Sequence, residues 1–225
     1  MEEKNKQAIR RYLSQYPDLF TEYEKEYILS CLDIERFDDL LPDVVREIYD
    51  ELGFLKKEDN IYIGFIDLLN HEFDYCNQNI LEVAGGIIPR LGKRISANQV
   101  KGKITIFDPR LSPYEKSTDS FRLMREAFSI HTDIQDANLL IGLMPCEATE
   151  DIICSACKNK VDFMIALCEG GMHGDEYDYF EDEEEWLHSI ICSARNSVRK
   201  SDLGKLQIQY LKKYHDPYPV IYNKR

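Results

Sequence analysis

The sequence predicts an α/β protein: a mostly parallel, seven-stranded sheet flanked by helices, with a helical N-terminal extension over residues 1–60. Three observations predict this class. From residue 80 onward, short apolar runs alternate with stretches of helical periodicity, which is typical of parallel strands joined by helices. The first apolar run ends in a Gly-Gly turn. The last two runs are joined by a loop too short for a crossover helix, so the final strand is expected to be antiparallel.

The N-terminal extension is expected to be helical because its apolar residues recur at helical spacing. They do so in three successive stretches, near residues 9–20, 27–32 and 44–52. A further helix is expected over the apolar stretch 61–73, packed on the sheet that follows. The main domain is therefore predicted to cover residues 61–225, with the extension as a cap.

The strands and helices of the main domain follow from the same patterns. The apolar runs 139–143 and 163–167 are almost continuous, as in strands buried on both faces. We expect strands at 80–83, 103–107, about 126–130, 138–143, 162–167, 206–211 and 219–223. We expect helices at about 88–98, 116–125, 147–159 and 182–200.

The turn after the first strand predicts a nucleotide site. Residues 80–83 form the strand, and Gly85 and Gly86 allow both a sharp turn and a close approach of a ligand to the backbone. Pro89 suits the first turn of the following helix. Asp108 ends the second strand about 22 residues after Gly86, near the spacing at which an acid reaches ribose hydroxyls.

Composition narrows the class of protein. The net charge of −13 repels phosphate backbones, which argues against a general nucleic-acid binder. No apolar run approaches the roughly 20 residues of a membrane helix, and the N-terminus lacks the apolar core of a signal peptide. Seven cysteines at irregular spacing suit a reducing compartment. A cytoplasmic protein that does not span a membrane is expected.

The glycine turn, the acid after the second strand and the terminal hairpin together resemble the class I S-adenosylmethionine (SAM) dependent methyltransferases. The resemblance covers about residues 61–225. It implies a seven-stranded Rossmann-like sheet with an antiparallel last strand, and SAM as the cofactor. It also implies transfer of a methyl group to an acceptor, a small molecule or a protein, that the sequence does not identify.

The resemblance places the cofactor on the turn after the first strand. Glu82 stands at the position of the family's acid. Ala84, Gly86 and Ile88 stand at its three glycine positions, so Gly86 alone is kept, and Gly85 supplies flexibility beside it. The branched side chain of Ile88 is expected to narrow the site at the amino-acid end of the ligand.

The same resemblance assigns further contacts. Asp108 would hold the ribose hydroxyls, and Asp133 and Ile134 would contact the adenine. The fourth strand ends in Met144-Pro-Cys146, which is similar to a Leu-His-x-Cys segment in one branch of methyltransferase-like proteins. Met144 replaces the histidine and Cys146 keeps the cysteine, and both are expected at the cofactor.

Other interpretations stay open at this point. A dinucleotide fingerprint would require glycine at the positions of Ala84, Gly86 and Pro89, and only the second is glycine. A Gly-Gly turn can also be purely structural. A methyltransferase fold that has lost catalysis and serves as a binding or scaffold protein is a further alternative, motivated by Ile88 and Met144.

Cysteines and acids supply the remaining candidates. Cys154 and Cys157 form a C-x-x-C pair, but no second pair follows at zinc-finger spacing, so no metal site is expected. Cys146 and Cys168 end neighbouring predicted strands, where Cys146 is a candidate nucleophile or substrate contact. The acidic segment 175–186 is either a solvated loop or a lid that attracts a cationic substrate.

Overall fold

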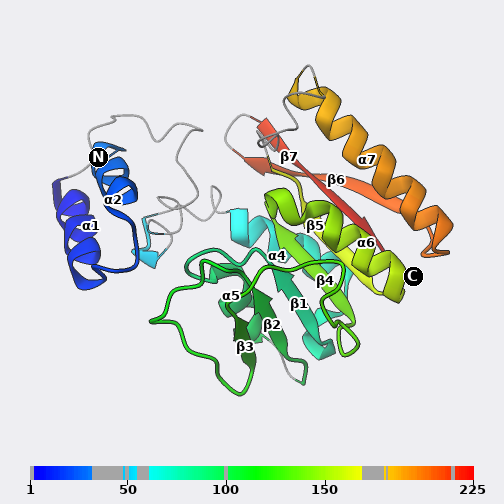
Figure 1. Ribbon diagram of the computed structural model, residues 1–225, viewed down its shortest axis with the longest axis horizontal. Coiled ribbons are helices and arrows are strands. Elements are labelled where there is room, and N and C mark those ends of the chain that lie inside the picture. The colour runs from blue at the N-terminus through cyan, green and yellow to red at the C-terminus, as the bar shows by residue number, and fades with distance from the viewer. Residues whose placement is uncertain are drawn as a thin grey trace.

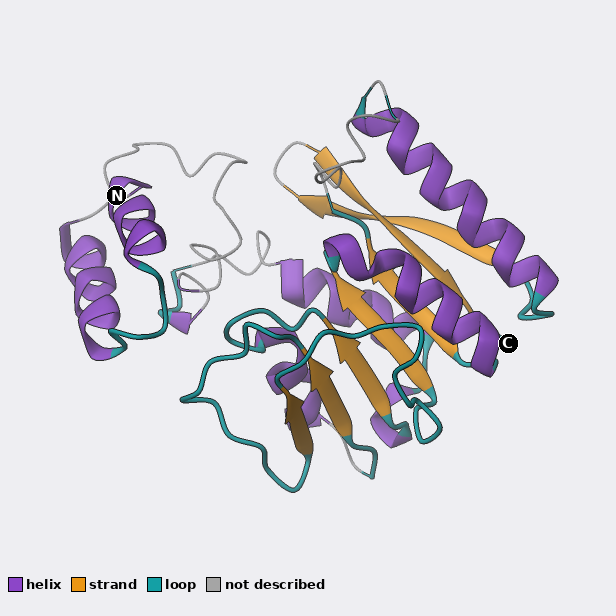
Figure 2. Ribbon diagram, viewed as in Figure 1, coloured by secondary structure: helices purple, strands orange, loops and turns teal. Residues whose placement is uncertain are grey.

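A seven-stranded sheet forms the centre of the computed structural model, with helices on both of its faces (Figures 1 and 2). The structure describes residues 3–31, 48, 51–54, 61–98, 101–168, 180, 182–213 and 216–225. Its strands are β1 (Ile80–Val83), β2 (Ile104–Phe107), β3 (Phe121–Met124), β4 (Leu139–Leu143), β5 (Asp162–Ala166), β6 (Leu206–Lys213) and β7 (Asp216–Asn223). Its helices are α1 (Glu3–Gln15), α2 (Glu22–Cys31), α4 (Ile61–Glu72), α5 (Arg90–Asn98), α6 (Thr149–Asn159) and α7 (Glu183–Lys200).

The strand order confirms the predicted fold class. The order is β3-β2-β1-β4-β5-β7-β6, and the pairs among β1 to β5 are all parallel. β7 is antiparallel to both β5 and β6, as expected for the final strand. β1 lies between β2 and β4. The chain therefore extends the sheet from β1 to β2 and β3 on one side, and then from β4 onward on the other side. Ligands of open α/β sheets bind at such a switch point, outside the carboxyl ends of the strands.

Two layers of helices bury the two faces of the sheet. α4 and α5 cover one face, where Phe65 and Leu69 pack with strand residues such as Ile141. α6 and α7 cover the other, where Ile152 and Ile190 belong to a second core cluster. Successive side chains of each strand point to opposite faces of the sheet, so each strand contributes to both cores.

The region between residues 116 and 130 corrects the sequence analysis. The expected helix 116–125 and strand 126–130 are wrong, because residues 121–124 form β3 and loops flank it. The hydroxyl of Thr118 accepts hydrogen bonds from the backbone N–H groups two and three residues ahead, and that of Ser117 accepts one from the N–H six residues ahead. Such bonds give the backbone an alternative to the helix.

The N-terminal helices α1 and α2 lie to one side of the molecule, away from α6 and α7 (Figure 1). Ile9 of α1 and Ile28 of α2 are fully buried in a cluster that also contains Ile87 and Ile88 from the turn after β1. The expected third helix, near residues 44–52, lies largely outside the described residues.

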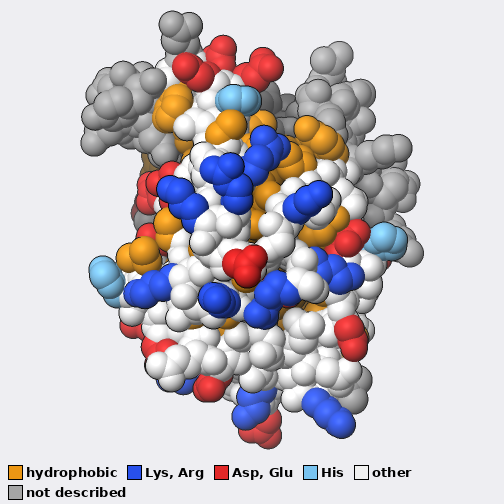
Figure 3. Space-filling view, turned by 90° about the vertical axis from the view of Figure 1, so that its right-hand side faces the viewer, with side chains coloured by type: hydrophobic (Ala, Val, Ile, Leu, Met, Phe, Trp, Pro, Cys, Tyr) orange, Lys and Arg blue, Asp and Glu red, His pale blue; other side chains and the backbone are white. Residues whose placement is uncertain are grey.

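The surface around the C-terminus is basic despite the negative net charge. Lys and Arg side chains gather on the side of the molecule where α7 and the C-terminus lie (Figure 3). Lys158, Arg199 and Lys200 occupy the last turns of α6 and α7, where cations complement the helix dipoles. Among the described residues, no helix has the length and apolar character that crossing a membrane requires.

Candidate functional site

A cavity of about 190 Å3 lies at the carboxyl ends of β1, β2 and β4, the switch point of the sheet. Its walls contain seven of the nine residues expected at the cofactor: Glu82, Ala84, Gly85, Gly86, Asp108, Met144 and Cys146. The other lining residues are Tyr62, Ile87, Leu91, Arg110, Leu143 and Pro145. Sequence reasoning missed Arg110, although it stands two positions after the predicted acid.

Glu82 is a buried acid with an unused oxygen. Its side chain is 2% exposed, and its Oε2 has no hydrogen-bond partner among the described residues. Burial, and secondarily repulsion by Asp108, raises the pKa of Glu82 from 4.5 to about 8, against the effect of a hydrogen bond from the Gly92 backbone. Gly92 lets α5 approach this closely, because a Cβ there would lie 2.3 Å from Oε2. A cationic ligand group would satisfy this carboxyl.

Asp108 connects the turn after β1 with the turn after β2. Its Oδ2 accepts a hydrogen bond from the backbone N–H of Gly86 at 2.9 Å, across 22 residues of chain. Its Oδ1 accepts another from the N–H of Arg110 at 2.7 Å. A carboxylate has about four lone-pair positions, so both oxygens can still accept a hydrogen bond from a ligand hydroxyl.

Left-handed backbone concentrates around the same cavity. Ala84 (φ 61°), Met144 (φ 54°) and Cys146 (φ 47°) are three of the five non-glycine residues with positive φ in the described part of the chain. Gly86, with φ 77°, lies between them in the cavity wall. Conformations of this kind are strained for residues with a Cβ and cluster at functional sites.

Ile88 does not narrow the cavity, so that expectation is wrong. Its side chain is 2% exposed and packs in the cluster formed with α1 and α2, whereas its neighbour Ile87 lines the cavity. The turn at the third glycine position of the family therefore faces the N-terminal helices.

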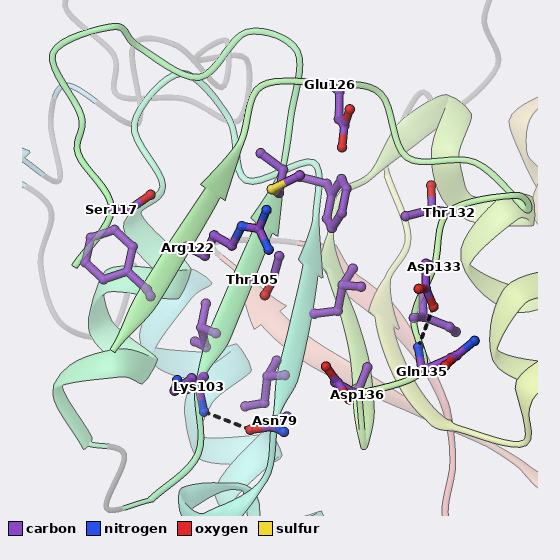
Figure 4. A pocket seen from close by; sticks show the side chains of 18 of the residues that line it. Asn79, Lys103, Thr105, Ser117, Arg122, Glu126, Thr132, Asp133, Gln135 and Asp136 are labelled. Carbon is purple, nitrogen blue, oxygen red and sulfur yellow. Dashed lines mark hydrogen bonds between the residues drawn. The ribbon is translucent and has the colours of Figure 1, made fainter. Parts of the chain in front are cut away.

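The two remaining predicted residues lie elsewhere. Asp133 and Ile134 line a larger hollow of about 1010 Å3 on the face of β1, β2 and β3 opposite α5 (Figure 4). Asp133 Oδ1 accepts a hydrogen bond from the N–H of Gln135 at 3.1 Å, and Ile134 is buried in the core. In the figure, Thr105 and Arg122 project from the strands into this hollow. The structure does not bring Asp133 or Ile134 into the wall shared by Glu82 and Asp108.

The N-terminal helices are attached to the loops that form the cavity. Arg110 Nη2 lies 2.8 Å from Glu24 Oε1 of α2. The rings of Tyr16 and Tyr114 meet edge to face, with their centroids 5.4 Å apart. An ion pair joins Glu51 to Arg90 at the start of α5. The extension is thus in contact with the segments that follow β1 and β2.

The cysteines separate into different environments. The sulfur atoms of Cys146 and Cys168 lie 3.6 Å apart, while Cys154 is exposed on α6 and Cys157 is buried. Within the described residues, no three His, Cys, Asp or Glu side chains converge in a way that could hold a metal ion. Residues 175–179 and 181 of the acidic segment 175–186 lie outside the described residues, but Asp182 caps α7 by accepting a hydrogen bond from the N–H of Glu185.

A solved methyltransferase domain shares this architecture, although no family model and no curated protein matches the sequence. The methyltransferase domain of bacterial CtHen1 superposes with a TM-score of 0.53 at 6% identity, over 76% of this chain and 100% of that domain. The chain has a methyltransferase fold. A methyltransferase from Listeria monocytogenes, described as a SAM-dependent enzyme, gives 0.48 at 12% identity over 72% and 98% of the two chains. Precorrin-6y C5,15-methyltransferase from Geobacter metallireducens gives 0.46 at 12% identity over 72% and 87%. Identities this low establish the fold alone.

Proposed function

We propose that this chain is a SAM-dependent methyltransferase and that the cavity at the carboxyl ends of β1, β2 and β4 is its cofactor site. The observation that carries the proposal is the meeting of two buried acids, Glu82 and Asp108, with a strained turn in one cavity at the switch point of the sheet. The acceptor is a small molecule or a protein, since a net charge of −13 disfavours nucleic acid.

The residues of the cavity fit SAM chemically. SAM carries a cationic ammonium group, which suits the buried carboxyl of Glu82, and a ribose diol, which suits the remaining acceptor positions of Asp108. The cavity of about 190 Å3 is smaller than the roughly 300–1,000 Å3 of typical ligand pockets. SAM would therefore extend beyond this cavity, with its adenine outside the wall formed by Gly86 and Met144.

The chain's contribution to catalysis would be alignment. SAM, when bound, supplies a methyl group on a sulfonium, which an aligned nucleophile accepts. Glu82 would hold the ammonium group and Asp108 the ribose, on the two sides of the sulfonium, and the turn of Met144, Pro145 and Cys146 would form the wall beside the reacting centre. No nucleophilic triad is needed for this role.

We further propose that residues 1–60 form a cap on the domain 61–225, supported by the contacts of α1 and α2 with both cavity loops. The cysteine content supports a cytoplasmic location.

Binding of SAM and of its demethylated product tests the proposal. Isothermal titration of the full chain should show micromolar binding of both ligands. Asp108→Asn should weaken binding about 10–100-fold, because a charged acceptor of two ribose hydrogen bonds becomes a neutral amide. Asp18→Asn makes the same chemical change at an exposed position and should leave the affinity unchanged. If neither ligand binds at high micromolar concentration, the proposal is wrong.

In the same titration, Asp133→Asn tests whether the ligand reaches from the smaller cavity to the larger hollow. The resemblance assigns Asp133 to the adenine, whereas in the structure it lines the larger hollow. A loss of affinity would show that the ligand reaches Asp133 in that hollow, and an unchanged affinity would show that the part of the ligand outside the smaller cavity does not contact Asp133.

The small cavity also favours a second candidate, a methyltransferase-fold protein that binds a partner without catalysis. A chain that stays folded but binds neither SAM nor its product would support this second function.

A further inference from the structure

Two thiols meet at the carboxyl edge of the sheet. β4 and β5 are neighbouring parallel strands, with Leu143 opposite Ala166. Cys146 follows the first of these strands and Cys168 follows the second, and their thiols are hydrogen-bonded with the sulfur atoms 3.6 Å apart. Both side chains are only partly buried, so a small oxidant can reach them.

The backbone on both sides holds this pair together. The N–H of Met144 donates to the carbonyl of Ala166 at 2.9 Å, which ties the turn after β4 to β5. The hydroxyl of Thr149, at the start of α6, donates to the carbonyl of Cys146 at 2.7 Å. Cys146 is thereby held in a left-handed conformation, with φ of 47°.

The two cysteines of α6 lie in different surroundings from each other. Cys154 is exposed on α6, and Cys157 is buried one turn further along the same helix. A disulfide bond has sulfur atoms about 2.05 Å apart, so Cys146 and Cys168 need to approach by roughly 1.5 Å to form one.

We propose that Cys146 and Cys168 form a reversible disulfide that reshapes the cavity lined by Cys146. The oxidant is a hydroperoxide, for which hydrogen peroxide is the simplest case. One thiolate attacks a peroxide oxygen, the O–O bond breaks, and a sulfenic acid and hydroxide form. The second sulfur then attacks the sulfenic sulfur, the S–S bond forms, the S–O bond breaks, and water leaves. In total the two thiols lose two protons and two electrons, and one hydrogen peroxide becomes two waters.

The disulfide acts on the cavity through the turn that follows β4. Cys146 and Met144 both line the cavity, and Cys146 Sγ also donates a hydrogen bond to the Met144 carbonyl at 3.4 Å. Drawing Cys146 towards Cys168 breaks this contact and moves the wall beside Gly86 and Asp108. A cavity of about 190 Å3 has little spare volume, so the oxidised chain binds SAM at least about tenfold more weakly than the reduced chain. This consequence rests on the proposed function, whereas the disulfide itself does not.

Peptide mapping tests the disulfide without any ligand. The full, folded chain is treated with hydrogen peroxide, blocked with an alkylating agent, digested without reductant and analysed by mass spectrometry. The expected product is one cross-linked species joining the peptides of Cys146 and Cys168, two hydrogens lighter than their sum and cleaved by dithiothreitol. Cys154→Ser should form it equally well, and Cys168→Ser should not form it. Alkylation of both Cys146 and Cys168 after peroxide treatment, or a scrambled set of cross-links, would overturn the proposal.

A parallel titration with SAM tests the effect on the cavity. Reduced chain should bind SAM, peroxide-treated chain should bind it at least about tenfold more weakly, and dithiothreitol should restore binding. Cys168→Ser should keep its affinity after peroxide. Equal affinity of the reduced and the cross-linked chain would overturn the effect on the cavity. Failure of the reduced chain to bind SAM would instead contradict the proposed function, while the cross-linked peptide would still establish the disulfide.

Discussion

Glu82 shows how much a single buried side chain reveals about the site. Its pKa rises from 4.5 to about 8, chiefly because burial disfavours the charged form. The folded chain therefore holds this proton more tightly than the unfolded chain does. Its contribution to stability is full below about pH 4.5 and is lost as the pH rises through about 8.

Glu82→Gln should consequently stabilise the ligand-free chain in a pH-dependent way. The amide keeps the shape of the neutral acid but cannot ionise. Urea unfolding should give similar free energies for the variant and the wild type at about pH 5, and a variant more stable by a few kcal/mol at about pH 9. Glu126→Gln, at an exposed position, should show no such difference. A Glu82→Gln effect that is constant with pH would contradict the buried, protonated state of this side chain.

The residues of the site were predictable to different degrees. Asp108 follows from its spacing after the glycine turn and Glu82 from the resemblance to the methyltransferases, and the structure places both in one cavity. The direction in which the Ile88 side chain points does not follow from the sequence, because it depends on packing against α1 and α2, which lie much earlier in the chain. The position of Asp133 depends on where β3 begins, which the sequence analysis placed wrongly.

At the level of elements, α5 makes the acid site possible by carrying a glycine. A Cβ on Gly92 would lie 2.3 Å from Glu82 Oε2 and 2.4 Å from Ile106 Cδ1, both far inside contact distance. Gly64 in α4 offers a matched comparison, since a Cβ there would meet only Leu211 Cδ2, at 3.9 Å. Both glycines carry the same intrinsic penalty inside a helix.

The two Gly→Ala variants should therefore change stability in opposite directions. Gly64→Ala should stabilise the chain by about 0.5–1 kcal/mol through helix propensity. Gly92→Ala should destabilise it by about 1–3 kcal/mol, because overpacking outweighs propensity. Chemical unfolding at pH 7 measures both. Equal stabilisation by the two substitutions would mean that α5 does not rest on Glu82 as described.

The element that the sequence analysis missed is β3, and the reason is local. Its four residues, Phe121–Met124, include a single fully buried side chain, so they lack the apolar run that marked the other parallel strands. The hydroxyl oxygens of Ser117 and Thr118 accept hydrogen bonds from the backbone N–H groups of Leu123 and Phe121, which favours a non-helical conformation in the preceding segment. The hydrophobic pattern of the sequence does not reveal contacts of this kind, whereas it located the apolar strands β4 and β5 correctly.

At the scale of the whole molecule, the sequence predicted the parallel sheet and its reversed final strand but not two of its long-range features. The apolar runs locate the strands other than β3, and the short loop before β7 fixes its direction. The hollow over β2 and β3 arises because no helix covers that part of the face in the described residues. The ion pair of Glu24 with Arg110 joins residues 86 positions apart, a distance that no local pattern spans.

Asn223, at the end of β7, connects the last strands of the sheet through its side chain. Its side chain is fully buried, and its Oδ1 accepts a hydrogen bond from the N–H of Phe163 in β5 at 2.9 Å. Its Nδ2 donates to Asp162 Oδ1 at 3.0 Å and to the carbonyl of Leu203, just before β6, at 3.4 Å. One amide thus connects β5, β7 and the entrance to β6 in the interior.

Asn223→Ala should destabilise the whole chain by about 1–3 kcal/mol, because it leaves the buried N–H of Phe163 without the acceptor Oδ1, whereas Asp162 keeps its ion pair with Arg225. Asn159→Ala is the matched control. The Asn159 amide donates to the carbonyl of Ser155 one turn back in α6, so its loss should change stability by less than about 1 kcal/mol. Urea unfolding gives both values, and hydrogen exchange should show the amides of β5 and β7 losing protection first in Asn223→Ala. Equal effects of the two substitutions would mean that the final strand is held by its backbone ladder and apolar face, with no special contribution from this amide.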